Sequence, residues 1–169
     1  SSIRSMSPLG IGPVLKDRSA VNIGLVSCMS YLDDKGFGPS LVHRNGVTRA
    51  RMFQEITIAQ QTDCSDDAAL AAALDQLEAT LNSPLGNMKG DYCVGQYTLA
   101  DCAWAGVCQV ATNMGKGTAV SSRSAVNTWF AAVQSHPSTS KEAINPFSCL
   151  STKADHDANS MRDVRINTA

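Results

Sequence analysis

Thr98-Leu99-Ala100-Asp101 marks the start of a long apolar helix, from which the rest of the predicted fold can be worked out. The Thr98 hydroxyl can accept a hydrogen bond from the backbone N–H three residues on, and the Asp101 carboxylate can reach back to the N–H of the cap residue. We expect the helix to end at Asn113 and Gly115. The spacing predicts an inward face of Leu99, Cys102, Ala103, Gly106, Val107 and Val110. Because Gly costs a helix about 1 kcal/mol relative to Ala, we expect a neighbouring element to approach closely at Gly106.

Three further helices surround this one in the sequence, each indicated by apolar residues three or four positions apart. The first runs from about Gly46 to Gln61 behind an Asn45 cap, the second over residues 65–83 and the third over residues 122–135. Their predicted apolar faces are, in order, Met52, Phe53, Ile56 and Ala59; Leu70, Leu74, Leu77 and Leu81; and Val126, Trp129, Phe130 and Val133. The short links between these helices favour a compact helical bundle.

The beginning of the chain reads differently. Residues 13–15 and 20–22 are short extended candidates joined by a polar turn, and residues 25–32 are predicted to form a short helix with Val26, Met29 and Leu32 facing inward. At the other end of the chain, residues 146–169 are poor in apolar side chains. We therefore divide the chain into residues 1–40, a helical domain over residues 41–145 and a partly ordered tail over residues 146–169.

The composition excludes several classes of protein. With 169 residues, 43% hydrophobic and 17% charged, the chain is predicted to be a soluble globular domain. A formal charge of −1 argues against strong binding of nucleic acid through an overall positive field, so we expect any contact with tRNA to be at most indirect. The sequence shows no run of about 20 apolar residues and no secretory signal pattern, so we expect no membrane association.

The cysteines indicate neither a metal centre nor a disulfide framework. They stand at positions 28, 64, 93, 102, 108 and 149, without the spacing of a zinc knuckle, and the three histidines lie near no cysteine pair. We expect reduced thiols, a cytoplasmic location, no metal and no cofactor.

Several motifs together resemble the glutathione transferases. Residues 7–15, which include Pro13, resemble the segment that enters a strand after a cis peptide bond in that family. Residues 94–101 and 126–137 resemble, in the right order, parts of its all-helical C-terminal domain. The resemblance implies a mainly α fold, in which a truncated thioredoxin-like βα half precedes a bundle of the C-terminal transferase type. In this family the Thr98 to Asp101 element is a folding motif, so Pro13, Thr98 and Asp101 are expected to be structural.

Two departures from the family bear on catalysis. The strand, helix and strand that carry the catalytic Tyr, Ser or Cys of transferases have no counterpart ahead of Pro13 in this sequence. The Glu/Gln-Ser pair that holds the γ-glutamyl end of glutathione is replaced by Gly24-Leu25. Because a leucine side chain can neither accept nor donate a hydrogen bond, we expect glutathione to bind poorly and assign no catalytic residue.

A Gly-Leu pair in this place is similar to the non-catalytic transferase-like modules of the translation apparatus. These are an auxiliary protein of the multi-aminoacyl-tRNA-synthetase complex, also called elongation factor 1 epsilon, and the appended domains of methionyl- and glutamyl-tRNA synthetases. The resemblance implies a docking protein whose partner is a transferase-like domain of a synthetase or elongation factor subunit, or a second copy of the chain. Candidate interface residues are then Leu25, Met29, Arg49, Trp129 and Phe130. Such modules pair either through the helices that flank the hairpin or through the helices near the Trp-Phe segment. In the second mode the position before the tryptophan is often an Arg that forms an ion pair across the contact, whereas here it is Thr128, so we expect that interface to be altered or absent.

Other readings of these residues remain open. The chain could be a divergent transferase-like enzyme with weak thiol chemistry through Cys28 or Ser7, or a helical regulator outside translation. Ser27 or Cys28 could replace the lost nucleophile, although the nearby sequence offers no His to act as the base. Trp104 and Trp129 could form a surface that binds a ligand. Arg44, Arg49 and Arg51 could contact tRNA phosphates. Core packing and an exposed helix face account for the same residues without a ligand.

Overall fold

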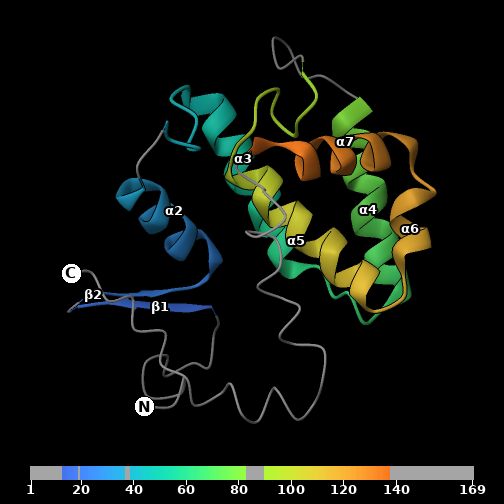
Figure 1. Cartoon of the computed structure of the whole chain (residues 1–169), viewed down its shortest axis with the longest axis horizontal. Helices are drawn as coiled ribbons and strands as arrows, with labels where there is room; N and C mark the ends of the chain where they lie inside the picture. The colour runs from blue at the N-terminus through green and yellow to red at the C-terminus, as the bar shows by residue number, and fades with distance from the viewer. Residues whose placement is uncertain (1–12, 19, 37–38, 83–89, 138–169) are drawn as a thin grey trace. The chain divides into compact units, whose positions relative to one another are not determined.

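The computed structural model describes residues 13–18, 20–36, 39–82 and 90–137, which form a hairpin and six helices (Figure 1). The chain divides into two compact units, residues 1–132 and 133–169, and only residues 133–137 of the second are described. The expected tail over residues 146–169 and residue Ser7 lie outside the described residues. In chain order the elements are β1 (Val14–Asp17), β2 (Ala20–Ile23), α2 (Leu25–Lys35), α3 (Gly46–Gln61), α4 (Asp67–Asn82), α5 (Leu99–Asn113), α6 (Gly117–Ser121) and α7 (Ser124–Ser135).

The hairpin and α2 form the βα part of the described chain. Strands β1 and β2 pair antiparallel with Val14 opposite Ile23 and Asp17 opposite Ala20. The hydroxyl of Ser27 in α2 donates to the Asn22 side chain, so the alternation of a strand places Val21 and Ile23 on the face of β2 that points away from α2. Both of these apolar side chains are exposed.

Helix α5 supplies more of the buried core than any other described element. It contacts α3 and α6, and its buried residues are Leu99, Ala100, Asp101, Ala103, Trp104, Val107, Cys108 and Ala111. They lie on more than one side of the helix, so the single inward stripe predicted from spacing was too narrow. Cys102 and Val110, which the spacing placed inward, are only half-buried, whereas Trp104 and Cys108 are fully buried.

The other helices follow the predicted period closely. Met52, Ile56 and Ala59 of α3, the first three predicted leucines of α4, and Val126, Trp129 and Val133 of α7 are all buried. Phe53 and Phe130 are half-buried because they stand at the edges of these stripes, and Leu81 is half-buried at the end of α4.

Two expectations about single residues are wrong. Leu32 was expected to face inward, but α2 continues to Lys35 and leaves the Leu32 side chain 51% exposed. Gly106 was expected at a close approach, yet a Cβ added there would meet nothing within 4 Å. A local pattern shows which residues could share a face but not which faces find a neighbour.

Helix α6 was not predicted, since its five residues are too short to show a helical period. It begins where α5 ends in a glycine turn. Gly115 has a φ of +80°, and the N–H of Lys116 donates to the Ala111 carbonyl at 2.8 Å. This closure satisfies carbonyls at the end of α5 and places Lys116 at the start of α6. No helix in the described ranges has the length and apolar character needed to cross a membrane.

Candidate functional site

The junction between β2 and α2 is the place where the transferase resemblance positions a glutathione anchor. The N–H of Gly24 donates to the Pro13 carbonyl at 2.9 Å, and the Gly24 carbonyl accepts from the N–H of Cys28 at 3.0 Å. Gly24 has a φ of +89°, in the region that side-chain-bearing residues rarely adopt. The backbone turn into α2 is therefore built for glycine at this position, and the next residue, Leu25, carries no polar group.

Cys28, the candidate nucleophile, is buried in this junction with 5% of its surface exposed. Its Sγ lies 3.4 Å from the Asn22 carbonyl oxygen and 3.6 Å from that of Pro13. Carbonyl oxygens accept the thiol hydrogen but cannot act as the general base that nucleophilic catalysis requires. The Nδ2 atom of Asn22 is buried without a hydrogen-bond partner among the described residues.

The other described thiols are poor nucleophiles because burial disfavours the thiolate. Burial, with a smaller effect of the neighbouring Asp101 carboxylate, raises the pKa of Cys93 well above its ordinary value. Burial also raises the pKa of Cys108 to about 12 and, more modestly, those of Cys64 and Cys102. These four side chains are free thiols.

Asp101 is a buried structural carboxylate that accepts four hydrogen bonds. Its Oδ2 accepts from the Thr98 backbone N–H at 2.8 Å, as the predicted capping box requires, and also from the Thr98 hydroxyl at 3.1 Å. The Thr98 side chain faces the backbone N–H of Asp101, which completes the box. The Oδ1 atom of Asp101 accepts from the Cys93 N–H at 3.0 Å and from Trp129 Nε1 at 2.8 Å. Asp101 thus connects three parts of the fold: the loop before α5, the start of α5, and α7. Both of its carboxylate oxygens accept two hydrogen bonds each from these parts.

A second buried carboxylate, Glu55 of α3, was missed in the sequence. Its two oxygens lie 3.0 Å from an Arg51 guanidinium nitrogen and 3.1 Å from Trp104 Nε1. Arg51 also donates to the Thr80 hydroxyl of α4 at 3.2 Å. Arg51 therefore belongs to the packing between helices rather than to an open basic face. A signal was present, since Glu55 stands next to Ile56 and three residues after Met52 on the predicted apolar face.

A third polar group links the hairpin to α2 and was also missed. The Tyr31 hydroxyl donates to Asp17 Oδ2 at 2.6 Å, and Lys35 Nζ lies 3.5 Å from the same oxygen. The tyrosine hydrogen bond, with the nearby lysine, holds the pKa of Asp17 below its ordinary value. These contacts span up to 18 positions of sequence, and no local pattern predicts them.

The residues predicted to form an interface differ in exposure. Arg49 is exposed on α3, whereas Leu25 and Met29 of α2 and Phe130 of α7 are half-buried. Trp129 is buried, with its ring stacked 6.2 Å from that of Phe130. The indole N–H groups of Trp104 and Trp129 each donate a hydrogen bond to a buried carboxylate. The role of the five predicted residues at an interface stays a prediction.

Within the described ranges, no group of three or more His, Cys, Asp or Glu side chains is arranged to hold a metal ion.

The comparisons with known proteins establish the fold. No model of a protein family and no curated protein sequence matches the chain. Among solved structures, it is similar to the holo structure of maleyl pyruvate isomerase, described as a bacterial glutathione S-transferase of the zeta class. The match has a TM-score of 0.66 and 18% sequence identity, and covers 83% of this chain and 76% of the isomerase chain. The prediction of a truncated thioredoxin-like half followed by a helical domain of the C-terminal transferase type is therefore confirmed.

Proposed function

We propose that this chain is a non-catalytic association module that docks onto a transferase-like domain of another protein. We further propose that this partner belongs to the translation apparatus, as a subunit of an aminoacyl-tRNA synthetase or elongation factor complex. Its activity is then binding itself, and the thiol chemistry of transferases is absent from its function.

The observation that carries the proposal is the Gly24-Leu25 pair at the start of α2. A glycine at a φ of +89° followed by an apolar side chain offers no side-chain partner for the charged γ-glutamyl end of glutathione. The packing of Cys28 against two carbonyl oxygens supports the same conclusion, since no base accompanies it in those contacts.

Exposed apolar side chains support a docking role. Val47, in the first turn of α3, has 73% of its surface exposed, and Leu32 of α2 is exposed as well. They accompany Leu25, Met29 and Arg49 on two helices that contact one another. Large exposed apolar side chains in neighbouring elements are typical of protein interfaces.

The first test measures association. We expect a tagged copy of the chain, recovered from native extract, to carry synthetase or elongation factor subunits that mass spectrometry identifies. Val47→Asp should reduce this recovery several-fold without unfolding α3, because an acidic residue is favourable in the first turn of a helix. Ala68→Asp introduces the same charge at an exposed position in the first turn of α4, where an acidic residue is equally favourable, and should leave recovery unchanged. Recovery without any translation protein would overturn the translation assignment.

The second test addresses the rival function, a divergent glutathione-dependent enzyme. The structure similar to this chain is that of an enzyme, which favours this alternative. We expect no retention on glutathione-agarose and no turnover of chlorodinitrobenzene. Turnover that Cys28→Ser abolishes would establish the enzyme and refute the non-catalytic proposal.

A further inference from the structure

We propose that residues 116–125, here called the strap, form a conformational device that charged side chains clasp to α4 and to the turn before it, and that opens as a unit before α4 and α5. The strap comprises α6 and the turns on either side of it, and α6 contacts both α4 and α5.

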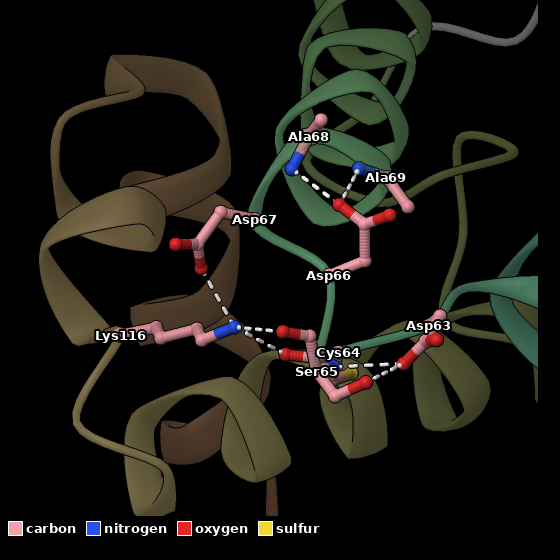
Figure 2. Close-up of polar contacts among 8 residues, drawn as sticks. All are labelled: Asp63, Cys64, Ser65, Asp66, Asp67, Ala68, Ala69 and Lys116. Carbon is pink, nitrogen blue, oxygen red and sulfur yellow. Dashed lines mark hydrogen bonds and ion pairs between the residues drawn. The ribbon is translucent and has the colours of Figure 1, made fainter.

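The first clasp lies at the beginning of the strap. Lys116 Nζ donates to the carbonyl oxygens of Cys64 and Ser65 at 2.9 and 2.8 Å and lies 2.6 Å from Asp67 Oδ1. Figure 2 shows the lysine extended toward the turn that joins α3 to α4, with its nitrogen among these three oxygens. All three hydrogens of the ammonium group have an acceptor, and none of these acceptors lies in the strap.

The second clasp lies near the other end. Arg123 Nε and one terminal nitrogen lie 2.8 and 2.7 Å from Asp75 Oδ1, and that terminal nitrogen also donates to the Ala71 carbonyl at 3.1 Å. These two acceptors belong to α4, whereas the other terminal nitrogen donates to the Ala119 carbonyl at 2.5 Å within the strap. Glu78 of α4 then accepts from the N–H groups of Ala125 and Val126 at 3.1 and 2.8 Å, where α7 begins.

Apolar burial contributes little to holding the strap. Val120 is its only buried residue, whereas α5 buries eight and α4 buries three leucines. Segments with few buried apolar contacts open locally at a lower free energy than the core around them. The partners in the ion pairs, Asp67 and Asp75, are largely exposed, so dissolved ions can screen these pairs.

Hydrogen–deuterium exchange tests the proposal. We expect amides of residues 117–125 to exchange faster than those of α5 in the wild-type chain. Lys116→Met and Arg123→Met should each accelerate strap exchange by about tenfold or more, since charge-assisted hydrogen bonds are lost, while exchange in α5 stays unchanged. Lys35→Met is the matched control, because it removes an exposed lysine that is paired with Asp17 on the hairpin.

Equal exchange in the strap and α5, or unchanged strap exchange in both clasp variants, would overturn the proposal. Equal acceleration of α5 would do the same, since the opening would then be global. If the variants do not fold, the wild-type chain decides. Raising NaCl from about 0.1 M to about 1 M shortens the Debye length from about 10 Å to about 3 Å and should accelerate strap exchange relative to α5. No relative change would refute the clasps.

Discussion

Two buried carboxylates organise the helical core at the level of single residues. Glu55 and Asp101 have no exposed surface, and each holds the indole N–H of one of the two tryptophans. A buried carboxylate is stable only when its oxygens are well supplied with donors, and Asp101 has four. These residues therefore specify how α3, α5 and α7 meet, in addition to stabilising each helix.

We expect Asp101→Asn to lower the free energy of unfolding by about 3 kcal/mol, because an amide nitrogen would face buried N–H donors that need an acceptor. Urea denaturation followed by tryptophan fluorescence measures the change. Asp91→Asn, at an exposed position in the preceding loop, is the control and should change stability by less than about 0.5 kcal/mol. A small effect at Asp101 would contradict its structural role.

We expect Tyr31→Phe to raise the pKa of Asp17 toward its ordinary value, because the hydroxyl donor that stabilises the carboxylate is removed. A pKa lowered by folding contributes stability that is present above about pH 4 and is lost as pH falls through the folded-state pKa. The variant should therefore lose less stability than the wild type on acidification. Carboxyl NMR titration measures the shift, and Asp63, whose lowered pKa arises mainly from Ser65, should not move.

At the level of elements, the N-termini of the helices are capped either by a residue just before the helix or by a side chain of another helix. Asn45 accepts from the N–H groups of Val47 and Thr48 at the start of α3, and Asp66 does the same for Ala68 and Ala69 in α4. The start of α7 instead depends on Glu78, which is 47 positions away from Ala125. Local caps are visible in a sequence, whereas a cap from another helix is visible only after folding.

We expect Gly106→Ala in α5 to increase the free energy of unfolding by about 1 kcal/mol, because the added methyl group meets open space and reduces the freedom of the unfolded chain. Thermal denaturation checks this. Gly90→Ala is the contrasting variant and should destabilise the protein, since its Cβ would lie 1.8 Å from the Gly95 carbonyl oxygen. Destabilisation at Gly106 would mean that a neighbour does approach it.

At the level of the whole molecule, the buried thiols report how cooperatively the helical body unfolds. Cys93 lies in the loop before α5 and Cys108 lies within α5, and both are buried with raised pKa values. Neither can react with an alkylating reagent until the structure around it opens.

We therefore expect Cys93 and Cys108 to be protected from iodoacetamide at about pH 8 in the native protein and to become reactive together as urea is added. Mass spectrometry of the alkylated peptides gives the two rates. Half-buried Cys64 is the internal reference and should react faster in the native state. Different urea dependences for Cys93 and Cys108 would show that the loop and α5 open separately.

The long helices could be predicted from the sequence to within about two residues at most ends because their apolar period is local information. The capping box at Thr98 was predicted for the same reason. Glu55, the Tyr31 and Asp17 pair and the strap were not predicted, since each depends on residues brought together from distant positions. The exposure of Leu32 and the free space at Gly106 likewise depend on neighbours that no period contains.

A mainly helical chain, a hairpin ahead of the helices and an apolar Leu25 after Gly24 follow from the amino-acid sequence, because composition, period and residue identity are properties of the chain alone. Which carboxylates are buried, which thiols are shielded and which charged side chains clasp the strap depend instead on the folded arrangement. Burial and hydrogen bonding act across space, and their free energies become defined only when packing has chosen each side chain's neighbours.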